Sequence, residues 1–302
     1  MVLLYIPPVQ NLLRREVTAY ASKATGMQIQ VERIDLRFPL NLLVRGVEVI
    51  QQPDTLLSLE SLNVRVQAWP LLKGKVEVDE VTLSQVAVNS ANLIEGMQIK
   101  GVLGRFFLQS HGVDLSNETA VVNRTELSDT HIQLLMTDTT TTPKDTTASA
   151  PVNWKVNLHQ LKLKNVSFGM KLPADSMKMA AYIGEATIDD AKADLKNQFY
   201  GLKQFLLSGA SASYDTGEVQ PSEGFDASHM AVRNIRIGLD SLLYEGRNMN
   251  AVIREITMEE RSGLSITSLT GRLFSNDSII RIPELKLQTP HSVSYTHLTL
   301  PT

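Results

Sequence analysis

Apolar and polar residues alternate along most of this chain. After Gly26 the apolar residues Ile29 and Val31, and then Ile34 and Leu36, are each separated by polar ones. The same alternation returns through 41–66, 76–89, 154–172 and 229–290. A period of two is typical of β-strands with one buried face. The sequence therefore predicts a mainly β protein, built from many amphipathic strands.

Two features break the alternation. The apolar phase slips by one residue between Leu59 and Leu62 and again between Val78 and Val81, which predicts a bulge or a short break in those strands. Before the first strand, residues 8–26 carry apolar side chains at three- and four-residue spacing and end on a glycine, so they predict one amphipathic helix. The apolar stripe of this helix consists of Val9, Leu12, Leu13, Val17, Tyr20 and Ala24.

Residues 180–207 fit either a strand or a helix, and their context favours strands.

The composition narrows the function classes. The 302 residues carry a formal net charge of -3, which gives no basic excess for nucleic acid, and no cysteine, which excludes thiolate metal sites and a cysteine nucleophile. The six histidines are scattered without ligand spacing. Adjacent carboxylates at 189–190 and 259–260 would point to opposite faces of a strand. No phosphate-binding or nucleophile motif occurs, so we expect no enzyme, no cofactor and no metal site.

The alternation leaves the architecture open. A closed β-sandwich would cover the apolar face of each strand with a second sheet, and this is the common solution for such strands. An open trough would leave that face free to hold acyl chains, and both arrangements need one apolar and one polar face. The residues that would line such a groove are Val64, Val66, Val76, Val78, Val81, Leu83, Leu161, Leu163, Val166 and Phe168.

Several phrases in the sequence resemble one family. LYIPPVQ is followed by the predicted helix, by QIQVERIDLRFPLNLLVRGVEV, and by the phrase LLKGKVEVDEVTL at 71–83. Further phrases are LKLKNVSFGMKLP at 161–173 and IPELKLQTP at 282–290. Together they resemble the N-terminal region of the TamB family of translocation and assembly module proteins, within the broader AsmA-like group, over roughly residues 2–292.

The resemblance implies an elongated, twisted antiparallel sheet that forms an open groove. It also implies a single anchor in the inner membrane of a diderm bacterium, with the bulk of the chain in the periplasm. In this reading the groove shields the acyl chains of phospholipids between the two membranes and supports outer-membrane biogenesis, and a C-terminal domain outside this sequence engages an outer-membrane barrel. The alternatives are an assembly factor for outer-membrane proteins that carries no lipid, and a soluble β-sandwich binding module.

The resemblance also suggests how the chain is organised. We expect residues 1–6 to be the remnant of a membrane anchor, followed by the helix and by a β segment at 27–135. A Thr-rich stretch at 136–151 has no periodicity and is predicted to be a disordered loop. A second β segment follows at 152–292, and residues 293–302 resemble a translated sequencing adapter. The apolar residues assigned to the anchor are Val2, Leu3, Leu4, Tyr5 and Ile6.

Overall fold

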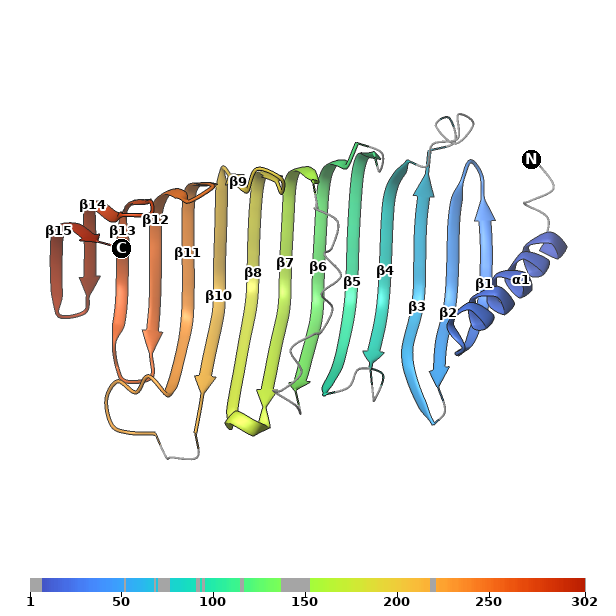
Figure 1. Cartoon of the computed structure of the whole chain (residues 1–302), viewed down its shortest axis with the longest axis horizontal. Coiled ribbons are helices and arrows are strands. Elements are labelled where there is room, and N and C mark those ends of the chain that lie inside the picture. Colours follow the sequence, from blue (N-terminus) through green and yellow to red (C-terminus); the bar gives the residue numbers. More distant parts are fainter. Residues whose placement is uncertain are drawn as a thin grey trace.

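The computed structural model describes residues 7–51, 53–67, 69, 77–90, 93, 96–114, 117–136, 153–217 and 221–301. They form one sheet of 15 strands with one α-helix at its N-terminal end (Figure 1) and a 3-10 turn at Pro173–Asp175, so the prediction of a mainly β chain with one amphipathic α-helix is confirmed. The elements are α1 (Pro7–Thr25), β1 (Gln28–Arg37), β2 (Asn41–Gln51), β3 (Asp54–Val66), β4 (Val78–Asn89), β5 (Met97–Asp114), β6 (Thr119–Met136), β7 (Lys155–Leu172), β8 (Met177–Asp194), β9 (Phe199–Leu202), β10 (Gln204–Asp215), β11 (His229–Glu245), β12 (Asn248–Glu260), β13 (Ser265–Ser275), β14 (Ile279–Thr289) and β15 (Ser292–Pro301).

The strands follow one another across the sheet in nearly the order of the sequence. The short strand β9 is outside this order: like β10, it lies between β8 and β11 and pairs with both of them. The pairs are antiparallel except for β6 and β7, which run parallel. The sequence predicts an antiparallel sheet, and the exception is a pair of strands separated by residues 137–154, a length that a parallel pair requires. Residues 180–207 lie in β8, β9 and β10, as their context predicts.

Helix α1 lies against the outer edge of β1. The Arg14 guanidinium donates a hydrogen bond to the Glu32 carbonyl (2.6 Å), and the Gln10 amide donates to the Leu36 carbonyl (3.0 Å). The Ile29 amide in turn donates to the Ser22 hydroxyl (3.1 Å). These bonds satisfy backbone groups that would otherwise be open to a further strand. Part of the predicted apolar stripe stays outside this contact, since Leu12 and Tyr20 of the same helix are both exposed.

The sheet is a single layer. Within the described residues, the elements in extensive contact are neighbours in the sheet, together with α1 and β1. The whole chain exposes 19307 Å², whereas the scaling for a compact monomer of 33.4 kDa gives about 12,600 Å². No second sheet covers the strands in the part of the chain that the structure describes, so the architecture is the open one and not the closed sandwich.

A transverse line of unusual backbone crosses the middle of the sheet. In each of the first eight strand pairs one interruption of the pairing falls on this line, and these interruptions adjoin one another from strand to strand. Five of the strands have a left-handed residue there. In β3 the residue on the line is Glu60, which has no register partner in β2 or β4 and accounts for the slip from Leu59 to Leu62. The transverse line comprises Glu32, Gly46, Glu60, Gln85, Gly104, Asp129, Asn165, Gly184 and Gly209, of which Gly46, Gln85, Asp129, Asn165 and Gly209 have φ between 49° and 61°.

Some predicted features fall outside the described residues. These are the anchor remnant at 1–6, Val76, and 137–151 of the predicted loop, whose first residue, Met136, ends β6. At the other end, the segment that resembles an adapter pairs with β14 as β15, from Ser292 to Pro301.

Candidate functional site

The strand register assembles the alternating apolar residues into continuous rows on one face. Residues directly opposite each other on paired strands point to the same side of a sheet. One row crosses thirteen strands from β1 to β14, a distance of about 60 Å at ~4.8 Å per strand. Its members are Ile34, Val44, Leu62, Leu83, Phe106, Leu127, Leu163, Ala186, Leu207, Ile237, Ile256, Leu269 and Leu287.

Three further rows flank this one. The row containing Leu36 runs on one side, and the rows containing Val31 and Ile29 run on the other, beyond the transverse line. We call the four rows together the apolar face. From Ile29 to Leu36 the face is about 23 Å wide at ~3.3 Å per residue, which exceeds the ~15 Å depth of one leaflet of a bilayer.

The structure brings the predicted groove residues together on this face. Val64 is opposite Val81, and Leu161 lies in the same row three strands further on, opposite Thr125 and Ile188. Leu83 and Leu163 belong to the central row. Val66 is opposite Val78 at the margin of the apolar face, beyond the pair of Val64 and Val81. The two remaining described positions lie beyond the transverse line: Val166 opposite Ile183, and Phe168 opposite Ala181.

The middle of the apolar face is half-buried in most strands, although no other described element lies over it. Ile34, Leu59 and Ala186 are less than 10% exposed, whereas Ile132 and Phe168 in an outer row are each 40% exposed. In a single-layer sheet, side chains of the same face are what can shield a residue in this way. The centre of the apolar face is therefore more shielded than its side, where apolar side chains stand open to solvent.

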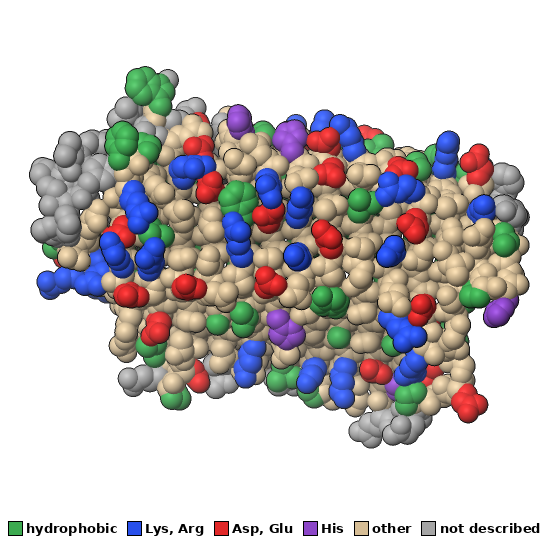
Figure 2. Space-filling view, turned by 180° about the vertical axis from the view of Figure 1, so that it is seen from behind, with side chains coloured by type: hydrophobic (Ala, Val, Ile, Leu, Met, Phe, Trp, Pro, Cys, Tyr) green, Lys and Arg blue, Asp and Glu red, His purple; other side chains and the backbone are tan. Residues whose placement is uncertain are grey.

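The opposite face of the sheet is charged. Figure 2 shows basic and acidic side chains interspersed over it. Cross-strand ion pairs join Arg65 to Glu80 at 2.6 Å and Arg233 to Glu259 at 3.0 Å. We call this side the polar face. A sheet with one apolar and one charged face separates a lipid-compatible surface from water without a second layer.

Two carboxyl groups of the described residues have pKa values lowered by hydrogen bonds. A hydrogen bond from Lys203 (2.7 Å), supported by His159 (3.1 Å), lowers the pKa of Asp190. Hydrogen bonds from Ser262 lower the pKa of Glu260, which ends one row of the apolar face opposite Val232. Both carboxyl groups are thus held as anions at neutral pH, whereas a general acid needs the opposite shift.

The described ranges contain no group of three His, Asp or Glu side chains placed to hold an ion. In the same ranges, no helix has both the length and the apolar character that crossing a bilayer requires.

The predicted groove residues cover only part of the apolar face. They lie in β3, β4 and β7, while Phe106, Ile188 and Ile256 occupy equivalent positions in other strands. The same alternation marks these strands, so the signal was present in the sequence. What the sequence lacked was the register that makes all of these positions one surface.

Neither the models of protein families nor the curated proteins include a match to this chain.

Proposed function

We propose that the apolar face shields phospholipid acyl chains from water and guides them along the sheet, in a protein that connects the inner and outer membranes of a diderm bacterium. The observation that carries this proposal is the apolar face itself: it is continuous across thirteen strands and uncovered in the described structure. The resemblance to the TamB family supports the same function. In this proposal the chain is not an enzyme, its bulk lies in the periplasm on an inner-membrane anchor, and a barrel in the outer membrane is its distal partner.

The energetics suit a conduit. An acyl chain of about fourteen methylene groups, half shielded from water at ~0.8 kcal/mol per fully buried group, would be stabilised by about 6 kcal/mol. This is enough to keep the chain on the face, and it leaves an open side for the head group. Each row repeats similar Val, Leu and Ile side chains from strand to strand, so a step to the next strand exchanges like contacts for like. The free energy along the path is therefore nearly level.

Site-specific photo-crosslinking tests the proposal in cells that carry the full-length protein. Photoreactive residues replace Val81 and Leu163 on the apolar face, and matched controls replace their neighbours Thr82 and Lys164 on the polar face. We expect phospholipid adducts at the first two positions and not at the controls. Equal yields on both faces, or no lipid at Val81 and Leu163, would refute the conduit. Capture of outer-membrane proteins there instead would favour the assembly factor.

A further inference from the structure

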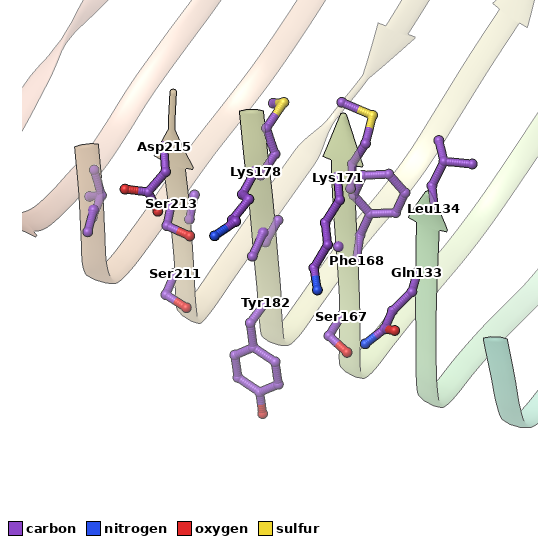
Figure 3. A pocket seen from close by; sticks show the side chains of 18 of the residues that line it. Gln133, Leu134, Ser167, Phe168, Lys171, Lys178, Tyr182, Ser211, Ser213 and Asp215 are labelled. Carbon is purple, nitrogen blue, oxygen red and sulfur yellow. The ribbon is translucent and has the colours of Figure 1, made fainter. Parts of the chain in front are cut away.

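A hollow of about 1090 Å³ lies on the polar face, towards the end of the sheet where β7 turns into β8. On β8 its lining includes Lys178, Ala180 and Tyr182, which alternate with residues of the apolar face. On the neighbouring strands it includes Ser167 and Lys171 of β7, and Ser211, Ser213 and Asp215 of β10 (Figure 3). Most of the lining comes from such polar-face positions, and Phe168, Ala181 and Val232 of the apolar face also contribute to it.

The floor of the hollow is a row of small residues. Gly169 is opposite Ala180, Ala180 is opposite Ser213, and Ser213 is opposite Ala231. A Cβ added to Gly169 would meet no atom closer than 3.9 Å, so the backbone there is open. Because the row crosses the strands, the hollow is a channel at right angles to them. With Lys100 of β5 and Arg261 after β12 at its two ends, it spans six strand spacings, or about 29 Å.

The walls of the channel carry uncompensated positive charge. Lys171 and Lys178 are directly opposite each other on paired strands, an arrangement that destabilises a sheet. Neither ammonium group has an ion-pair partner within the described residues, and the same holds for Lys100 and Arg261. Asp215 is opposite Lys178 but forms no ion pair with it. The lining thus holds a cationic excess in a chain whose net charge is -3.

The spacing of these cations indicates the shape of the ligand. Lys100 and Lys178 are three strand spacings apart, about 14 Å, and Arg261 lies another three beyond Lys178. A compact phosphate could not reach all three, but an extended chain at ~3.3 Å per residue covers the channel with about nine residues. Part of the neutral lining suits a peptide backbone, since it offers amides, hydroxyls and a phenol: Gln98, Gln133, Ser167, Ser211, Ser213 and Tyr182. The rest of the neutral lining is apolar and includes Leu134, Leu135, Met170 and Met179.

We propose that this channel binds an extended, acidic segment of a partner protein, laid across β5 to β12 on the polar face. Carboxylates of the segment pair with Lys171 and Lys178 in the middle and with Lys100 and Arg261 at the ends. The main chain of the segment lies on the small residues of the floor. Because Lys171 and Lys178 stand on the opposite face of the sheet from Leu163, a partner can pair with them while the central row of the apolar face is occupied.

Peptide binding to the 302-residue chain tests the proposal by fluorescence anisotropy. The probe is a labelled peptide of about nine residues in which glutamate alternates with serine, and glutamine replaces glutamate in its neutral counterpart. We expect the acidic probe alone to bind, and the double variant Lys171→Gln/Lys178→Gln to weaken its binding by about tenfold. Raising the ionic strength should weaken it further.

Matched variants make the result specific. Lys162→Gln/Lys164→Gln removes the same charge from the same strand and face, outside the lining, and should change the affinity less than twofold. Ala180→Trp fills the exposed floor without altering charge and should abolish binding. Equal weakening by both lysine pairs would refute the channel, as would full competition by inorganic phosphate. A preference for vesicles of anionic phospholipid over the peptide would also refute it. Lipid crosslinking at Leu163 should be unchanged in every variant, which separates this proposal from the proposed conduit.

Discussion

Replacing Gly46 by alanine tests the backbone of the transverse line. Gly46 has φ +58°, and a left-handed conformation costs alanine about 1 kcal/mol. A Cβ there would also lie 2.6 Å from Glu32 Oε2 and 2.7 Å from Glu32 Cβ. The carboxylate can move aside, but the Glu32 Cβ is fixed to β1, so relieving the second contact requires the strands to shift. Such overpacking adds about 2 kcal/mol, and we expect a total loss of about 3 kcal/mol in the free energy of unfolding.

Gly209 provides the matched control on the same line. Its φ is +61°, but the atom nearest to a Cβ added there would be the Gly184 Cα at 3.8 Å, which is ordinary contact. Gly209→Ala should therefore lose only the conformational cost of about 1 kcal/mol. Gly209→Asn should lose less, because asparagine tolerates this backbone and occupies the same line at Asn165.

Urea denaturation followed by circular dichroism measures all three variants. The decisive quantity is the difference between Gly46→Ala and Gly209→Ala, which we expect to be about 2 kcal/mol. Equal losses in the two alanine variants would show that the contact with Glu32 is not a constraint. No loss in either would show that these positions do not hold a left-handed backbone.

Three further predictions concern the face, the loop and the helix. Leu163→Glu should block lipid transfer between labelled vesicles while leaving the strands folded, whereas Lys164→Glu on the polar face should leave transfer intact. Hydrogen bonds from the Ser222 and Ser228 amides lower the pKa of the Asp226 carboxyl below its value in the unfolded chain. The stability that this carboxylate gives its loop is therefore present above about pH 4 and is lost as the pH falls. Hydrogen exchange of the two amides should speed up on acidification, and Asp226→Asn should remove that pH dependence. Arg14→Ala should loosen α1 by about 1 kcal/mol through the lost bond to the Glu32 carbonyl, seen as faster amide exchange in the helix, and unchanged exchange would contradict the edge contact.

Local patterns predicted the elements of this fold, because each is encoded within a few neighbouring residues. The alternation around Leu161 and Leu163 specifies a strand wherever that strand is placed, and Gly26 marks the end of the helix in the sequence and in the structure. The phase slip at Leu59 also has a local cause, the extra residue on the transverse line.

Other features depend on how distant segments meet. A single apolar strand face is compatible with an open or a closed architecture, so Leu83 could be assigned to a buried face but not to an uncovered one. The parallel pairing of β6 with β7 depends on the path of the connection between them. The channel on the polar face needs Gly169, Ala180 and Ser213 in one row, and only the register between strands creates that row.

The contact of α1 with β1 leaves one edge of β1 for pairing, so the strands can join the sheet in the order in which they are synthesised. With one edge of β1 occupied by the helix, β2 pairs on the other edge, and most later strands pair with the strand made just before them. Most contacts are therefore between segments that leave the ribosome in succession, an arrangement that favours rapid folding. The sheet can lengthen strand by strand during synthesis, and its early strands need not wait for later ones. A chain cut after β8 should therefore keep its first strands folded, as an array of repeats does.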